Sequence, residues 1–384
     1  MKSVLPLACL PGTLAAVFEL PVWIRNTYAV VEIEAGTPPV SHYLEFDTGS
    51  SSTWMASSDC VADPSACPNS SGYKRPGYDA SASSTSSSLN TTASIGYLGG
   101  TTGGSGAKDM FAMPSAPKDT WAQTFLAVNE SSFAALPGDG FLGLAFSTIA
   151  EGETTTLVET MMQDGLLDEP RFALYRGSET NDTGSSPGNG MLTVGGSHED
   201  KYVNGSLAWT QLQYPGSEAQ LWRTAMQSVV SRRPNTANTT FLDVNDCWAV
   251  FDTGAGGITV PDRLIDQIYE SIGMNYTAIL NGDVIPLCED FTDDWGITVY
   301  IGDFVPATEL TITGSMLKNP GFADGEAKYC WPPFDSNEAD GLFLFGNSFL
   351  QHFYTVFDFG GNLPTNYSAR IGLGPLKDEY KPVL

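Results

Sequence analysis

Short runs of apolar residues, rich in β-branched and aromatic side chains, recur along the chain between turns rich in Gly, Pro, Ser and Thr. The segments 28–33 (YAVVEI) and 297–301 (ITVYI) are typical examples. Runs of this length and composition predict β-strands. Few segments suit a helix, and the best of them are 155–163 and 262–272. The pattern therefore predicts an all-β fold with few helices.

Length and charge narrow the class of protein. The 384 residues, 42% of them apolar, are enough for two domains with a core each. Asp and Glu number 44 against 18 Lys and Arg, which gives a formal net charge of −26. This charge repels nucleic acid and anionic membranes, so we expect neither as a partner. This charge suits a protein that works at acid pH, because protonation of its carboxyl groups there reduces the repulsion among its negative charges.

The tripeptide Asp-Thr-Gly occurs twice, at 47–49 and at 252–254, and each copy follows a strand-like segment (YLEF and WAVF). Downstream of the copies lie the apolar-apolar-Gly segments 141–143 and 344–346. The spacing from the Asp to this Gly is 96 residues in the first copy and 94 in the second. Because a carboxylate at the end of a buried strand is costly unless something uses it, the repeat predicts one site built from a duplicated unit. Two unrelated Asx turns are the alternative.

The two aspartates, Asp47 and Asp252, suit acid–base chemistry if they lie side by side. Two adjacent carboxyl groups do not both ionise readily, because like charges raise one pKa. At mildly acidic pH such a pair shares a proton, so that a base and an acid face one water molecule. The base takes a proton from the water while the acid polarises a carbonyl. We therefore expect direct hydrolysis of an amide, without a covalent intermediate.

The residues beside the aspartates fit this chemistry. Gly49 and Gly254 allow two backbones and a water molecule to approach closely. Thr48 and Thr253 each offer a hydroxyl across a symmetric interface, and we expect them to hold the two loops together. Ser50 is placed to donate a hydrogen bond to the first aspartate.

The sequence lacks the motifs that metal-dependent or cysteine-dependent hydrolysis would need. The three histidines, His42, His198 and His352, are scattered, and the sequence contains neither HExxH nor CxxC. A zinc site or a cysteine nucleophile is therefore not indicated, and we expect no metal and no cofactor.

Further motifs complete a resemblance to a known family. Trp54 lies seven residues after the first aspartate, and 95–97 (IGY) precedes a Gly-rich stretch. The segments 139–146 (DGFLGLAF) and 345–350 (FGNSFL) are also characteristic. Together with the two Asp-Thr-Gly motifs, they resemble the pepsin-like aspartic proteases of the secreted, microbial type over nearly all of the chain after about residue 17. The resemblance implies a bilobal acid-protease fold, with two duplicated β lobes and a central cleft.

The resemblance implies roles for particular residues. It implies an N-terminal lobe over 17–197 and a C-terminal lobe over 198–384, with Asp47 and Asp252 as the catalytic dyad between them. It places Tyr97 on a flap that closes over the substrate, and the Gly-rich stretch after it suits a mobile lid. The alternative for Tyr97 is an ordinary strand aromatic.

The resemblance also implies which residues contact the substrate: Tyr97, Gly99 and Thr101 of the flap, Gly49 and Gly254, and the aromatics Phe133 and Phe141. For Phe133 and Phe141, candidates for the pocket before the scissile bond, core packing is an equal alternative. Trp54 either packs in the core, supports the flap, or does both. Relatives that accept Lys before the cut tend to carry Asp where this chain has Gly99, so we expect large apolar or aromatic residues on both sides of the cut.

Several features indicate secretion. Residues 1–16 resemble a signal peptide, although Pro6 and Pro11 weaken the resemblance, and no later segment is apolar enough to span a membrane. Eight Asn-X-Ser/Thr sequons fit a glycoprotein. We expect an extracellular protein, or one in an acidic compartment such as the vacuole.

The cysteines suggest two disulfides. Cys60 with Cys67 would close a small loop, and Cys288 with Cys330 a larger one. Cys9 and Cys247 have no obvious local partner; a free Cys247 or a bond between the two is open.

Two departures from the family pattern matter. Ala255 replaces a hydroxyl residue after the second motif, so we expect weaker hydrogen bonding around Asp252 and a shifted pH optimum. The family's basic pro-segment is not recognisable, so either the protein lacks it or the given start is incomplete.

We expect a monomeric aspartic endopeptidase that acts on proteins and peptides and is inhibited by statine-type peptides. The alternative is a pepsin-like binding protein with weak or absent catalysis. A cell-wall or lectin-like β protein would explain the composition but not the duplicated motif.

Overall fold

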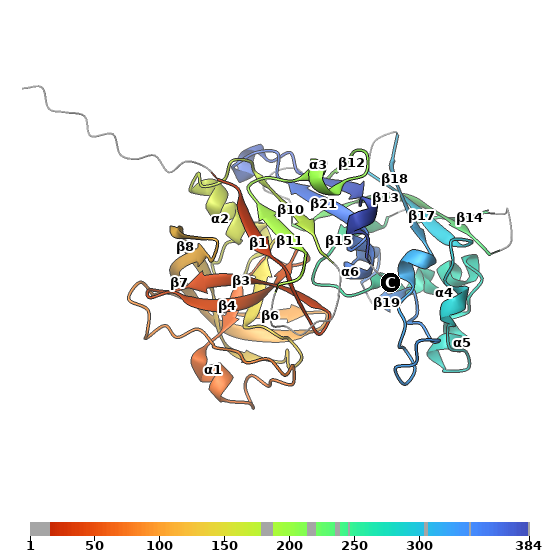
Figure 1. Ribbon diagram of the computed structural model, residues 1–384. Coiled ribbons are helices and arrows are strands. Elements are labelled where there is room, and N and C mark those ends of the chain that lie inside the picture. Colours follow the sequence, from red (N-terminus) through yellow and green to blue (C-terminus); the bar gives the residue numbers. More distant parts are fainter. Residues whose placement is uncertain are drawn as a thin grey trace, which may run out of the picture.

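The computed structural model describes residues 16–177, 187–212, 220–234, 239–244, 246–302, 306–337 and 339–382. The strands of this part of the chain form three β-sheets. One belongs to the first half of the chain, one to the second, and the third takes strands from both (Figure 1). The prediction of a mainly β, bilobal fold is confirmed.

The first sheet carries the strand that ends at Asp47. Its eight strands run in the spatial order β2-β3-β4-β9-β5-β8-β7-β6. Their bounds are β2 (Trp23–Arg25), β3 (Tyr28–Ala35), β4 (Val40–Asp47), β5 (Trp54–Ala56), β6 (Ser87–Tyr97), β7 (Gly100–Met113), β8 (Ala116–Ser131) and β9 (Gly140–Gly143).

The second sheet also has eight strands and carries the strand before Asp252. Its main path is β18-β17-β13-β15-β20-β16-β19, and β14 pairs with β13. The bounds are β13 (Arg223–Arg232), β14 (Thr239–Leu242), β15 (Trp248–Phe251), β16 (Ile258–Pro261), β17 (Gly296–Ile301), β18 (Thr308–Thr313), β19 (Asp335–Asn337) and β20 (Leu342–Phe345).

The duplication seen in the sequence is also present in the strand pairing. β4 lies parallel to β9, with Asp47 opposite Gly143. In the second sheet β15 lies parallel to β20, with Phe251 opposite Phe345, one residue before Asp252 and Gly346. The nearly equal spacing therefore reflects one strand pairing used twice.

The third sheet joins the two halves. Its order is β1-β11-β10-β21-β22-β12, and the pair β10–β21 links strands from the two halves of the sequence. The bounds are β1 (Phe18–Pro21), β10 (Arg171–Tyr175), β11 (Met191–Val194), β12 (Ala208–Gln211), β21 (Phe353–Asp358) and β22 (Arg370–Pro375). The predicted boundary between residues 197 and 198 falls after β11 and stays a prediction.

Both predicted helices are present. α2 (Leu157–Gln163) begins after Thr156, whose side chain accepts a hydrogen bond from the backbone of Glu159. α4 (Asp262–Ser271) packs Leu264, Ile265 and Ile268 against the core. The remaining helices are short: α1 (Ser58–Ala62), α3 (Glu199–Tyr202), α5 (Tyr276–Leu280) and α6 (Asn347–Leu350), with 3₁₀ turns at Ser147–Ile149, Cys288–Asp290, Ser315–Leu317, Pro364–Asn366 and Asp378–Tyr380.

Two disulfides join the cysteines as predicted. Cys60–Cys67 closes the loop around α1, and Cys288–Cys330 closes the larger loop. Cys247 is a buried free thiol whose sulfur accepts a hydrogen bond from Arg263 Nη2 (3.1 Å). Cys9 and residues 1–15 of the expected signal lie outside the described residues. None of the helices in the described part of the chain has the length and apolar character needed to cross a membrane.

Candidate active site

The two Asp-Thr-Gly loops meet between the lobes and are held together by a symmetric set of hydrogen bonds. Thr48 Oγ1 donates to Phe251 O (2.7 Å) and accepts from Thr253 N (3.0 Å). Thr253 Oγ1 donates to Phe46 O (2.8 Å) and accepts from Thr48 N (3.0 Å). Both threonines are buried. The two hydroxyls thus make the contacts across the interface that the sequence indicated.

The glycines bring the two carboxyl groups together. Gly49 N donates to Asp47 Oδ1 and Gly254 N to Asp252 Oδ1, each at 2.8 Å. A Cβ atom on Gly254 would lie 2.5 Å from Asp47 Oδ1, and one on Gly49 would overlap the carboxyl group of Asp252. Each glycine is thus packed against the opposite aspartate, and a side chain at either position would displace that carboxyl group.

The electrostatics of the pair favour one shared proton. Burial raises the pKa of Asp47, although the Ser50 hydroxyl and the Gly49 N–H oppose the rise. Burial, together with the negative charge of Asp47, raises the pKa of Asp252 well above its usual range. The pair therefore loses its protons in two separated steps, and the first charge is better stabilised on Asp47.

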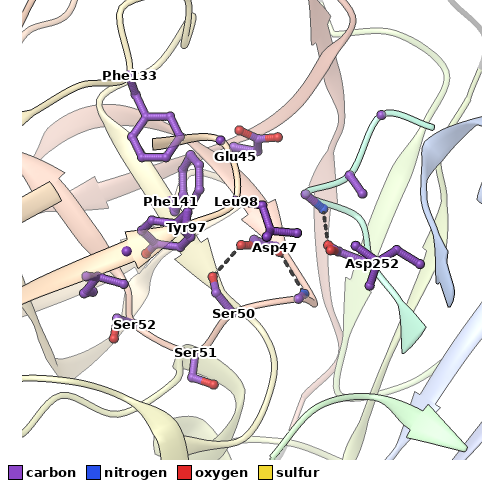
Figure 2. A pocket seen from close by; sticks show the side chains of 18 of the residues that line it. Glu45, Asp47, Ser50, Ser51, Ser52, Tyr97, Leu98, Phe133, Phe141 and Asp252 are labelled. Atoms are coloured by element: carbon purple, nitrogen blue, oxygen red, sulfur yellow. Dashed lines mark hydrogen bonds between the residues drawn. The ribbon is translucent and has the colours of Figure 1, made fainter. Parts of the chain in front are cut away.

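The hydrogen bonding around the pair is asymmetric. Ser50 Oγ donates to Asp47 Oδ2 (Figure 2). Ala255, at the equivalent position of the second loop, has no hydroxyl to offer Asp252. The contact predicted for Ser50 is confirmed, and the two aspartates differ in the way that the sequence indicated.

A β-hairpin covers the Asp47 side of the site. β6 and β7 form it, with Tyr97 opposite Gly100 and the turn at Leu98 and Gly99. Trp54 Nε1 donates to Tyr97 Oη (3.0 Å), while Trp54 itself is only 1% exposed. Trp54 therefore packs in the core and supports the flap, so both interpretations of this residue are correct.

The cleft between the lobes has a volume of about 760 Å³. Its lining from the first lobe includes Tyr28, Glu45, Asp47, Gly49, Ser50, Ile95, Tyr97, Leu98, Gly99, Phe133 and Phe141, and from the second lobe Asp252, Gly254, Ala255, Thr259, Asp335 and Leu344. Thr101, predicted to contact substrate, does not line this cleft; its N–H donates to Ser132 Oγ (2.8 Å). The reason is its place on β7, beyond the tip of the hairpin.

The aromatic residues of the flap side form one cluster. Tyr97 packs edge-on against Phe133 (ring centroids 5.5 Å apart) and Phe141 (5.2 Å). Phe141 is 6% exposed and also packs against Trp54 (5.0 Å). Phe133 and Phe141 thus serve the packing and line the cleft at once.

Comparison with known proteins agrees with this geometry. The sequence model of the family described as eukaryotic aspartyl protease matches residues 27–365. The chain belongs to this family. Its similarity to individual proteases is moderate: 29% identity over 348 residues to cathepsin E of Oryctolagus cuniculus, covering 89% of this chain and 79% of that protein. Pepsin A of Suncus murinus is 28% identical over 90% of this chain and 80% of its own, and cathepsin D of Gallus gallus is 28% identical over 85% and 77%.

The chain is thus a pepsin-like aspartyl protease, an aspartic endopeptidase by class. Besides the dyad, three carboxyl residues in the described part of the chain line the cleft of this protease, Glu45, Glu151 and Asp335, and the sequence identified none of them. Glu45 lies two residues before Asp47 on β4, and Asp335 lies on the C-terminal lobe. Burial raises the pKa of both, and for Glu45 the charges of Asp47 and Asp252 add to the effect. The signal for Glu45 was a carboxyl residue two positions before Asp47 in β4, the spacing that puts it on the same face of the strand as Asp47.

Proposed function

We propose that this protease hydrolyses peptide bonds at acid pH through a water molecule activated by Asp47 and Asp252. The observation that supports the proposal best is the reciprocal packing of each glycine against the opposite aspartate. This packing and the paired threonine hydrogen bonds hold two carboxyl groups where one proton is shared.

The chemistry proceeds in two stages. The ionised carboxylate takes a proton from water as the water oxygen attacks the carbonyl carbon, and the neutral carboxyl group gives its proton to the carbonyl oxygen. The tetrahedral diol then collapses: the C–N bond breaks, the leaving nitrogen takes a proton from the dyad, and a diol hydroxyl returns one to it. The products are a carboxylic acid and an amine, and the dyad again holds a single proton. The enzyme exchanges only protons with the substrate and the water, so no covalent intermediate forms.

The cleft supports a preference for large apolar residues around the cut. Tyr97, Phe133 and Phe141 present aromatic surface on the Asp47 side, and Leu344 lines the opposite lobe. Gly99 leaves the flap without a carboxylate, as the sequence indicated. We propose that peptides and proteins with aromatic or large aliphatic residues flanking the bond are substrates, and that statine-type peptides bind in the same cleft.

We further propose that the protein is secreted and glycosylated. Six of the eight sequon asparagines lie in the described residues and all six are exposed: Asn69, Asn90, Asn129, Asn204, Asn275 and Asn366. Asn181 and Asn238 lie outside the described residues. An acidic extracellular medium or an acidic compartment such as the vacuole would protonate the dyad to its active state.

The test is proteolysis of a protein substrate between about pH 3 and pH 5. The wild type is assayed with and without a statine peptide, beside the Asp47→Asn variant. We expect cleavage that the inhibitor suppresses and the variant lacks. If wild type and variant are equally inert while both bind the statine peptide, the protein is a pepsin-like binding protein instead.

A further inference from the structure

Glu45 is a buried carboxyl group without a partner. Its side chain is 3% exposed and faces the cleft, yet it forms no hydrogen bond or ion pair within the described part of the chain. Leaving such a group unsatisfied costs free energy that an apolar residue at the same place would not. The proposed reaction uses Asp47 and Asp252 and gives Glu45 no role. A ligand that supplies the missing donors would explain its position.

The strand pairing places Glu45 beneath an aromatic pocket. In the sheet it lies between Val30 of β3 and Phe141 of β9. Tyr97 and Phe133 lie on the Asp47 side of the cleft in Figure 2. Tyr28 also lines the cleft and is close enough to Glu45 for the charge of Glu45 to raise its pKa. The pocket therefore has aromatic walls and a carboxyl group deep within it.

The described part of the chain supplies no cation to this pocket. Neither lysine nor arginine is among the described residues that line the cleft. Arg25 lies against the ring of Tyr43 (3.8 Å to the centroid) and donates to Pro137 O, so its charge is engaged elsewhere. The carboxyl group is thus available to a charge that arrives with the substrate.

We propose that Glu45 is a specificity-determining residue that receives the lysine or arginine side chain of the residue before the scissile bond; this rests on the proposed endopeptidase function. The aliphatic stem of such a side chain packs along the walls formed by Tyr97, Phe133 and Phe141, and its charged end reaches the carboxylate. Aromatic faces attract the cation further. Large apolar residues use the same walls without Glu45, so the pocket accepts both kinds of side chain.

This proposal changes the interpretation of Gly99. The absence of a carboxylate on the flap indicated that lysine would not be accepted. Glu45 offers the carboxylate from the strand below the pocket instead of from the flap above it. The same recognition chemistry is therefore available from a different element.

The preference depends on pH. The titratable groups that act on Glu45 are Tyr28 on β3, Asp47 on its own strand and Asp252 of the other lobe. Tyr97 of the flap lines the same cleft, and the β9 residue opposite Glu45 is Phe141. Burial and the charges of the two aspartates raise the pKa of Glu45, so the empty pocket is neutral in acid. A bound cation favours the ionised form. The ratio of lysine to phenylalanine cleavage therefore rises as the pH increases.

The test uses peptides that differ only in the residue before the cut, which is Phe, Lys or Arg. We expect the wild type to cleave the Lys and Arg peptides within about tenfold of the Phe peptide. Glu45→Gln, of equal size, should lower kcat/KM for the basic peptides by about tenfold or more and change the Phe peptide by less than about threefold. Glu45→Leu should do the same, and titration with a statine peptide counts the folded sites of each variant.

Asp335→Asn is the matched control. It removes one carboxyl group from the same cleft but on the other lobe, so the ratio of Lys to Phe cleavage should stay within about twofold of the wild type. A wild type that cleaves the Phe peptide and leaves the basic ones intact would overturn the role of Glu45 and leave the endopeptidase standing. Equal losses on all peptides in Glu45→Gln, or an equal change of ratio in Asp335→Asn, would also overturn it. Failure to cleave any peptide would overturn both proposals.

Discussion

Removing the Ser50 hydroxyl should move the acidic limb of the pH–rate profile to higher pH. Ser50 Oγ donates to Asp47 Oδ2, and this hydrogen bond stabilises the ionised form of Asp47. In Ser50→Ala the bond is lost, so the charged form is less favoured and the pKa of Asp47 rises. Since that carboxylate is the base, activity on the acidic side should begin at higher pH.

The size of the shift follows from the contacts that remain. A hydrogen bond to an ionised group contributes about 1.5–3 kcal/mol, and about 1.4 kcal/mol corresponds to one pKa unit. The Gly49 N–H still donates to Asp47 at 2.8 Å, and water can occupy part of the space left by the hydroxyl. We therefore expect a shift of about one unit, at the low end of that range.

The assay is kcat/KM measured against pH, from about pH 2 to pH 7, with one peptide. The basic limb should stay in place, because it follows the second proton of the pair. The reciprocal variant Ala255→Ser offers Asp252 the missing hydroxyl and should move the basic limb to lower pH. An acidic limb that moves by less than about 0.3 units in Ser50→Ala, or moves downward, would refute the asymmetry described for the dyad.

Three further predictions concern the parts around the dyad. Thr48→Val leaves the buried Phe251 O and Thr253 N without partners and should lower the free energy of unfolding, measured in urea, by about 2–5 kcal/mol. The control Thr53→Val removes a buried hydroxyl that has no partner and should change this free energy little. Similar losses in both variants would contradict the role given to the Thr48 hydrogen bonds. Gly49→Ala places a methyl group against the carboxyl group of Asp252 and should lower kcat by about 10³-fold or more. Retained activity would show that the two Asp-Thr-Gly loops are not packed as tightly as described. Tyr97→Phe loses the hydrogen bond from the Trp54 indole and should lower kcat/KM about tenfold while leaving the thermal unfolding midpoint, Tm, unchanged. A large fall in Tm would instead identify Tyr97 as a packing residue only.

The features predictable from the sequence are those carried by local motifs. Two Asp-Thr-Gly copies at matched spacing indicated the paired site because the same parallel strand pairing, β4–β9 and β15–β20, is used twice. The hydroxyls of Thr48 and Thr253 were assigned correctly because symmetry brings identical loops face to face. The two segments named as the best helix candidates, 155–163 and 262–272, do form helices.

Features that depend on distant packing were not predictable. The dual role of Trp54 stayed open until its indole was seen to donate to Tyr97, 43 residues away. Thr101 was assigned to the cleft from the resemblance alone, and the structure places it on β7, outside the residues that line the cleft. Glu45 was visible in the sequence as a carboxyl residue two positions before Asp47. Its lack of a hydrogen-bond partner follows only from the packing of the strands and the flap around it.

The central claim is that Asp47 and Asp252 act as one unit, and it is tested most directly by a double-mutant cycle. kcat/KM is measured for Asp47→Asn, Asp252→Asn and the double variant on one peptide at about pH 4. We predict that each single substitution lowers the rate by about 10³-fold or more and that the double variant is no slower than the slower single one. Two smaller losses that multiply in the double variant, or a single variant that keeps about a tenth of the activity, would contradict the account.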